Sequence, residues 1–119
     1  MLCALAVIAL GACSDEGPVS GPGTMTATLL SPNGAEGAAY VLLLGEGIGD
    51  VTPLGDTELF SEASAAATQL VLINQTGGEL AFEVAVADTT QPPEAVIQEV
   101  AGPDDALRTL TGYTLEIVR

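Results

Sequence analysis

Apolar and polar positions alternate with a period of two along much of the chain after residue 23, a pattern typical of half-buried β-strands. The clearest example is the run 79–86, ELAFEVAV, in which Leu, Phe and Val alternate with Glu and Ala. The other predicted strands are alternating runs or unbroken apolar stretches of strand length, at 24–30, 38–44, 57–60, 68–73, 94–101 and 113–118.

Segments rich in Gly, Pro and Asn separate these runs, at 31–34, 45–50, 74–78 and 88–93. The segment GEGIGD at 45–50 lacks the GxGxxG spacing, and no helical pattern follows it. A phosphate-binding loop needs a helix N-terminus behind it, so this segment predicts an irregular turn or bulge. Gly77 and Gly78 predict a hairpin between 68–73 and 79–86.

Three segments carry some helical character. The small residues of 61–67, SEASAAA, predict a linker with some helical propensity. The run 94–101 is compatible with helix or strand, and its β-branched residues favour strand. The segment 102–108, GPDDALR, predicts one helical turn with an Asp cap, in which Arg108 pairs with Asp104 or Asp105.

About seven or eight short strands with Gly and Pro turns predict an all-β fold, a single antiparallel β-sandwich over 24–119. Such a sandwich resembles the cohesin and immunoglobulin-like folds. Tyr40 and Tyr113 occupy positions expected to face the core. The predicted core brings two sets of side chains together, Leu80, Phe82, Val84 and Val86 with Val41, Leu43, Leu70 and Leu72.

The N-terminal segment resembles a bacterial lipoprotein signal. An apolar run from Leu2 to Leu10 ends in the lipobox-like sequence Leu10-Gly11-Ala12-Cys13, and polarity rises directly afterwards. The resemblance implies a signal helix over 1–12, a lipid on the Cys13 thiol and a flexible tether over 13–23. No Lys or Arg precedes the run, which we attribute to a start codon further upstream.

Two other interpretations of this segment are an ordinary secretory signal and a membrane-spanning helix. A spanning helix needs about 20 apolar residues, so this run is too short. Cys13 directly follows the small residues Gly11 and Ala12 at the end of the apolar run, which favours a lipoprotein signal over an ordinary secretory signal. We therefore expect an exported, membrane-anchored protein, and Ser14 after the cysteine resembles the sorting pattern for the outer membrane.

The charged residues are nearly all acidic and narrow the range of functions. The chain has sixteen Asp and Glu residues and only two basic residues, Arg108 and Arg119, which gives a net charge of -14. Such a surface repels phosphate backbones, so nucleic acid is excluded as a partner. The chain has no Lys and no His, the residues that activate serine nucleophiles or form Schiff bases, so we expect no enzyme and no cofactor.

Carboxylates are the only candidate metal ligands present in number. Six of them lie in or near turns and are weak calcium candidates: Asp50, Asp56, Glu58, Asp88, Asp104 and Asp105. None belongs to a D-x-D-x-D-G loop, whereas calcium needs six to eight oxygens gathered in space. Solvated loop carboxylates are the favoured interpretation, and no metal site is expected.

The order of elements resembles small cohesin-like and carbohydrate-binding-module-like sandwiches of bacterial surface proteins. The resemblance covers residues 24–118 and rests on GAAYVLLL, GGELAFEVAVAD, PDDALR and GYTLEIV in that order. It implies a binding module, since cohesins bind dockerin partners through one sheet face. The chain departs from carbohydrate-binding modules because it has no Trp to stack on a sugar ring.

Two function classes follow from these observations. The first is a lipid-anchored structural or binding module that engages another envelope protein through a sheet face or edge. The second is a glycan-binding or small-ligand-binding lipoprotein, which requires a concave and partly aromatic pocket. An exposed apolar patch on a sheet distinguishes the first class, and an enclosed pocket with convergent polar groups the second.

We predict that Cys13 is diacylated and that the processed protein partitions with membranes, because two acyl chains give stable anchoring whereas one gives marginal binding. Cys13→Ser removes the thiol and should abolish both processing and membrane partition. Membrane fractionation with mass spectrometry of the N-terminus measures both effects. Unchanged processing and partition of this variant would show that the anchor is wrongly assigned.

Overall fold

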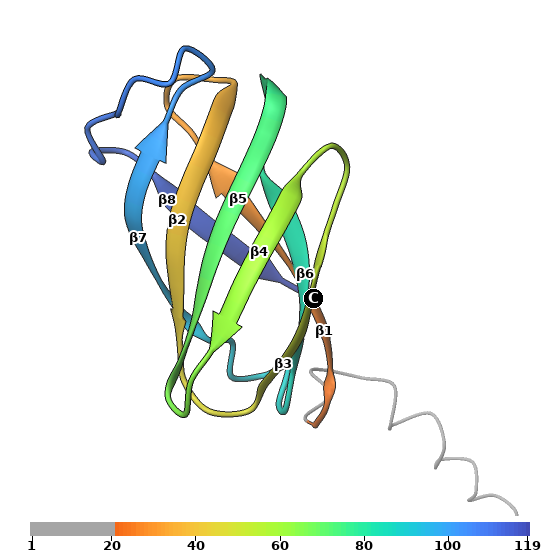
Figure 1. Cartoon of the computed structure of the whole chain (residues 1–119). Coiled ribbons are helices and arrows are strands. Elements are labelled where there is room, and N and C mark those ends of the chain that lie inside the picture. Colours follow the sequence, from red (N-terminus) through yellow and green to blue (C-terminus); the bar gives the residue numbers. More distant parts are fainter. Residues whose placement is uncertain (1–20) are drawn as a thin grey trace, which may run out of the picture.

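The computed structural model describes residues 21–119, which form two four-stranded antiparallel sheets packed face to face (Figure 1). No helix is present in this range, so the predicted all-β sandwich is confirmed. The predicted signal helix and Cys13 lie outside the described residues. The eight strands are β1 (Gly23–Leu30), β2 (Glu36–Leu44), β3 (Ile48–Pro53), β4 (Glu58–Ala63), β5 (Ala67–Gly78), β6 (Ala81–Val86), β7 (Glu94–Ala101) and β8 (Thr114–Val118).

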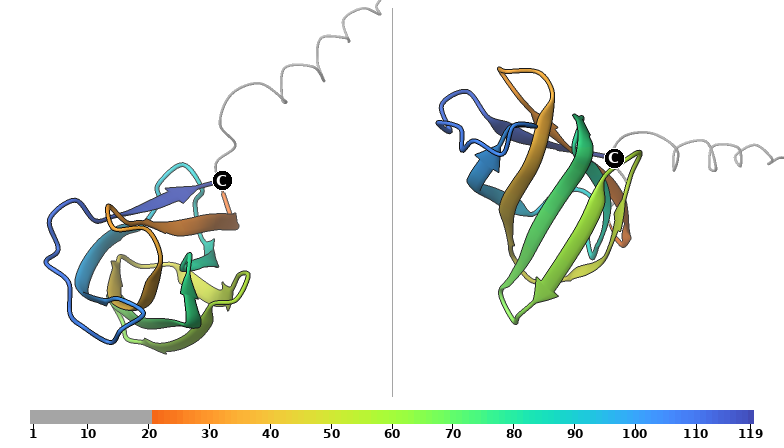
Figure 2. Two further views of the ribbon diagram at one scale, coloured as in Figure 1. Left: turned by 90° about the horizontal axis from the view of Figure 1, so that it is seen from above. Right: turned by 45° about the horizontal axis from the view of Figure 1, so that its top comes forward.

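The chain moves from one sheet to the other at almost every connection. One sheet has the order β3-β6-β1-β8 and is called the β1 sheet, and the other has the order β4-β5-β2-β7 and is called the β2 sheet. Only β4 and β5 are consecutive strands within the same sheet. Figure 2, seen from above, shows the resulting two layers.

The core lies between the two sheets and follows from the alternation of side chains. In β1, Met25, Ala27 and Leu29 point inward and are buried, while the threonines between them lie on the outer face. Phe82 is fully buried in β6, where its neighbour in register on β1 is the small Ala27. All eight residues of the predicted core are buried, which confirms that prediction.

The predicted hairpin between 68–73 and 79–86 is wrong. Residues 74–78 continue β5, which pairs with β2 and β4, whereas β6 pairs with β1 and β3 in the other sheet. Buried polar side chains hold this crossover: Asn74 Nδ2 donates to the Glu79 carbonyl at 3.3 Å, and Thr57 Oγ1 accepts from the Ala81 amide at 3.1 Å. The local turn preference of Gly77 and Gly78 is therefore overridden by the pairing of β5 and β6 with strands of different sheets.

None of the three segments with some helical character forms a helix, and 94–101 is strand β7, as its β-branched residues predict. Residues 61–63 belong to β4, and Ser64 closes a tight hairpin by donating its amide to the Ala67 carbonyl at 2.8 Å. In the segment 102–108, Asp105 adopts a φ of 66°, which interrupts any helix. The chain instead turns back on itself, and the Arg108 amide donates to the Val100 carbonyl at 2.8 Å.

Of the remaining predictions, those for the 45–50 turn and Tyr113 agree with the structure, and that for Tyr40 does not. The irregular turn or bulge at 45–50 is confirmed, since Gly45 and Gly47 have positive φ angles and the register with β6 shifts between Ile48 and Val51. Tyr113 is buried as expected. Tyr40 is not in the core: it lies on the outer face of β2, because neighbouring Ala39 and Val41 are the buried positions of that strand.

We predict that Phe82→Ala lowers the free energy of unfolding by about 3–5 kcal/mol, because it removes a fully buried ring from the centre of the core. Phe60 provides the matched control, since its side chain is exposed on β4. Phe60→Ala should change stability by less than about 1 kcal/mol. Urea unfolding followed by circular dichroism measures both values, and equal losses would contradict the assignment of the core.

Candidate functional site

The outer faces of the two sheets differ in chemistry. On the β1 sheet, neighbouring positions in register are Thr26 and Glu83 on one pair of strands and Thr28 and Glu116 on another. Glu116 is exposed and the other three are half-buried, so the centre of this face is polar. Its exposed large apolar residues, Leu30 and Val118, lie at the ends of β1 and β8.

The outer face of the β2 sheet is predominantly apolar. Phe60, Val71, Tyr40 and Glu99 form one row across all four strands, because each is paired in register with the next. Flanking rows add further aliphatic residues. We call the apolar members of these rows the apolar face: Ala38, Tyr40, Leu42, Phe60, Val71, Ile73, Val96 and Ala101.

Two of these side chains are exposed to solvent, and the other six are half-buried. Phe60 is 60% exposed and Val71 is 38% exposed, although both are large apolar residues in regular strands. Single exposed apolar residues need no explanation, but Phe60 and Val71 are adjacent in register and continue into a half-buried apolar surface. The apolar face is therefore the candidate functional site.

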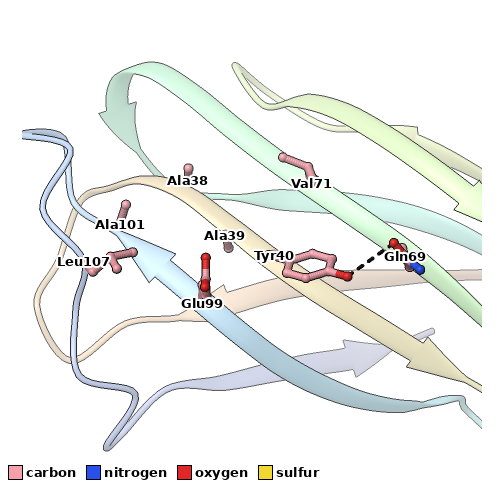
Figure 3. A pocket seen from close by; sticks show the side chains of 8 residues that line it. All are labelled: Ala38, Ala39, Tyr40, Gln69, Val71, Glu99, Ala101 and Leu107. Atoms are coloured by element: carbon pink, nitrogen blue, oxygen red, sulfur yellow. Dashed lines mark hydrogen bonds between the residues drawn. The ribbon is translucent and has the colours of Figure 1, made fainter.

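An open groove of about 440 Å³ crosses this face (Figure 3). Its floor includes Tyr40, whose hydroxyl donates to Gln69 Oε1 at 3.2 Å, with Val71 beside it on β5. Glu99 lies on the β7 side of the groove, and Leu107 lies at one end and is 71% exposed. The groove thus combines an aromatic side chain, aliphatic walls and a few polar groups.

Leu107 reaches the groove because the β7–β8 loop folds back against β7. An isolated bridge pairs Ala101 with Leu107, and the Gly102 amide donates to the Ala106 carbonyl at 2.9 Å. The side chain of the next residue, Arg108, does not line the groove and contacts the buried Glu36 instead. The anchoring of Arg108 therefore fixes where Leu107 lies.

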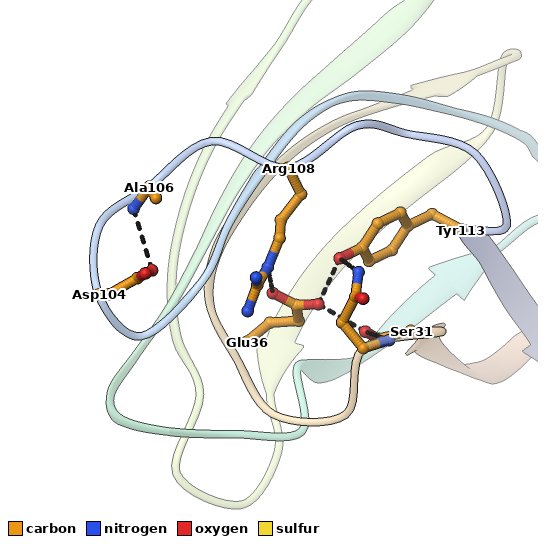
Figure 4. Close-up of polar contacts among 7 residues, drawn as sticks. Ser31, Glu36, Asp104, Ala106, Arg108 and Tyr113 are labelled. Atoms are coloured by element: carbon orange, nitrogen blue, oxygen red, sulfur yellow. Dashed lines mark hydrogen bonds and ion pairs between the residues drawn. The ribbon is translucent and has the colours of Figure 1, made fainter.

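Arg108 is anchored by Glu36, the buried acidic residue at the start of β2 (Figure 4). Arg108 Nε donates to Glu36 Oε1 at 3.1 Å, and the Ser31 and Tyr113 hydroxyls both donate to Glu36 Oε2. Asn33 Nδ2 donates to the Tyr113 hydroxyl at 2.9 Å. The Glu36 cluster, as we call these five residues, joins the β1–β2 loop, β2 and the β7–β8 loop.

A glycine makes room for the cation. A Cβ atom at Gly102 would lie 2.4 Å from a guanidinium nitrogen of Arg108, so the guanidinium occupies the space that a side chain would need. The Arg108 side chain is 28% exposed, so water still solvates it, whereas Glu36 is only 1% exposed. The Glu36 carboxylate therefore depends on its hydrogen-bond partners to offset the cost of its burial.

The electrostatic balance at Glu36 favours the ionised form. Burial opposes ionisation, but the hydrogen bonds from Ser31, Tyr113 and Arg108, together with the Arg108 charge, lower the pKa of Glu36 below its ordinary value of 4.5. The hydrogen bond to Glu36 in turn raises the pKa of Arg108. With both oxygens occupied, Glu36 is a structural anion and is not available as an acid or base.

The predicted pairing of Arg108 with Asp104 or Asp105 is wrong. Without a helix, residues four apart do not share a face, and Asp104 Oδ1 instead accepts from the Ala106 amide at 3.2 Å. Sequence reasoning missed Glu36 because it lies between small residues with no periodic signal. The only hint was that Arg108, as the interior cation of an acidic chain, needed a partner.

The calcium candidates are dispersed over separate elements of the fold. Asp50 lies in β3, Asp56 in the following turn, Glu58 in β4, Asp88 after β6, and Asp104 and Asp105 in the β7–β8 loop. Hydrogen bonds from Thr90 to its carboxylate lower the pKa of Asp88. Within residues 21–119, no three His, Cys, Asp or Glu residues are arranged to hold a metal ion.

Comparison of the chain with protein-family models, with curated proteins and with solved structures finds no match. The class defined by the fold is therefore an eight-stranded antiparallel β-sandwich with one apolar outer face. The lipobox and the cohesin-like resemblance stay predictions. Across residues 21–119, no helix has the length and apolar character needed to cross a membrane.

We predict that Glu36→Gln lowers the free energy of unfolding at pH 7 by about 2 kcal/mol, because hydrogen bonds to a buried charge are lost or weakened. The pKa of Glu36 is lower in the folded state, so its contribution is present above about pH 4.5 and disappears as the pH falls through the folded value. The difference between variant and parent should therefore shrink at pH 3.

Urea unfolding at pH 7 and pH 3 measures this difference. Glu46→Gln is the control, because it removes the same charge from a residue that is exposed in the turn before β3. It should follow the parent at both pH values. A Glu36→Gln effect that is independent of pH would contradict an ionised Glu36.

Proposed function

We propose that this protein is a lipid-anchored binding module of the cell envelope that engages another envelope protein through the apolar face of the β2 sheet. The observation that carries the proposal is the difference between the two outer faces, one rich in Thr and Glu and the other lined by adjacent apolar residues. A monomeric domain has no need to expose such a surface to water.

The physical benefit of covering this face is large enough for recognition. Burial of apolar area is worth about 25 cal/mol per Å², so covering a ring such as Phe60 contributes on the order of 1 kcal/mol. An aromatic and aliphatic centre with a polar rim is also the arrangement common in protein interfaces. In the sequence, the lipobox-like segment ending at Cys13 supports membrane anchoring, with export to the outer membrane as the proposed location.

One observation favours the second candidate, a glycan-binding or small-ligand-binding lipoprotein. Tyr40 lies in the open groove rather than in the core, with Gln69 and Glu99 beside it. An aromatic ring with nearby hydrogen-bonding groups can stack on and orient a sugar. The groove is open and has a single aromatic residue, which is a weaker arrangement than an enclosed pocket.

Site-specific photocrosslinking in intact cells tests the proposed function. A photoreactive amino acid at Gln69, on the apolar face, should give a discrete protein adduct, whereas the same amino acid at Glu116, on the outer face of the β1 sheet, should not. Val71→Asp in the Gln69 protein should abolish the adduct, because it places a charge in the apolar centre.

Two results would count against the proposal. Adducts formed equally from both faces would mean that contact is nonspecific. A carbohydrate adduct at Gln69 in place of a protein adduct, lost in Tyr40→Ala, would instead establish the glycan-binding function.

A further inference from the structure

The edges of the two sheets differ in how far they are protected against further strand pairing. β3 ends in Pro53 and has a shifted register, and β7 has a shifted register and is bridged by the β7–β8 loop at Ala101. β8 has only five residues. β4 is six residues long, pairs with β5 without any register shift, and contains no proline. A regular edge of this kind can accept another strand.

The side chains of β4 make its edge continuous with the apolar face. Glu58, Phe60 and Glu62 alternate along the outer face, while Leu59 packs against the core. Phe60 lies beside Val71 in register, so it is the lateral end of the apolar row. A strand added at this edge would cover Phe60 with its own outer side chains.

The charges around Phe60 indicate the chemistry of the added strand. Glu58 receives a hydrogen bond only from a neutral group, Gln75 Nε2 at 2.9 Å. Arg108 is engaged with Glu36, and Arg119 follows β8 in the other sheet, so no cation of residues 21–119 neutralises Glu58 or Glu62. Like charges directly opposite each other destabilise paired strands, so two β4 strands from separate copies repel.

We infer that β4 accepts an extended segment of the partner protein as a fifth strand of the β2 sheet, with outer side chains in the order basic, apolar, basic. The inference rests on the proposed function and specifies the partner at that site. Backbone hydrogen bonds supply affinity, as in other cases of strand addition, and alternate side chains supply selectivity. Alternate residues share a face, so the three side chains lie opposite Glu62, Phe60 and Glu58.

The test is titration of the isotope-labelled full-length chain with the synthetic peptide TKTVTKT, followed by NMR. Saturable binding with the largest amide shifts in β4 is expected. E58Q/E62Q should weaken binding about five-fold, since it removes two cross-strand charge pairs. The matched control is E83Q/E116Q, which makes the same charge change on the β1 sheet and should bind as the parent does. The peptide TETVTET should not bind.

Two N-methylated versions of TKTVTKT test for strand addition itself. Successive backbone amides point to opposite edges of a strand, so methyl groups on the odd or on the even amides block one edge each. A peptide paired with β4 should tolerate one set and lose binding with the other. Equal tolerance of both sets, no saturable binding of TKTVTKT, or self-association of the unliganded chain through β4 would each overturn the inference.

The outcome is separable from that of the proposed function. A protein adduct at Gln69 without binding of TKTVTKT would leave the apolar face as an interface and reject strand addition at β4. Binding of TKTVTKT without an adduct at Gln69 would support strand addition and reject the sheet-face interface.

Discussion

The ion pair between the buried Glu36 and the partly exposed Arg108 is the constraint on which the upper part of the sandwich depends. It brings a carboxylate into the interior, and only the two hydroxyls and the guanidinium around it make that placement tolerable. Because these partners come from the β1–β2 loop and the β7–β8 loop, one interaction fixes connections from both ends of the chain (Figure 4). It also sets the position of Leu107 at the end of the groove.

The Glu36 cluster and the apolar face are linked through β2. Inward positions of this strand, such as Val41 and Leu43, belong to the core, whereas Tyr40 and Leu42 lie outward among apolar neighbours. β2 is therefore apolar on both faces, unlike β1, whose outer face carries threonines at 24, 26 and 28 and a leucine only at its end. A strand that is apolar on both faces is normally covered on both. No second cover is present within residues 21–119, and that is the physical basis for the proposal that this face binds a partner.

Much of the fold was predictable from alternation alone, because side-chain period in a strand is a local property. The core face of β6 and the inward positions of β2 and β5 followed directly from it. Sheet membership did not, since Gly77 and Gly78 carry a local turn signal whereas the partners of β5 and β6 lie far away in sequence. Tyr40 was misplaced for a similar reason: an unbroken apolar run does not reveal which of its faces is covered. Glu36 depended on contacts with residues more than seventy positions away.

The acidity of the chain has a role in this arrangement that composition alone did not reveal. Carboxylates such as Glu58, Glu62 and Glu99 surround the apolar face without entering its centre, so they keep an exposed apolar surface soluble and oppose pairing between copies. In the proposed complex, the same charges would attract a partner of opposite sign and raise its rate of association. Apolar residues at the centre would then supply most of the affinity, while the glutamates at the rim select against other copies of this chain.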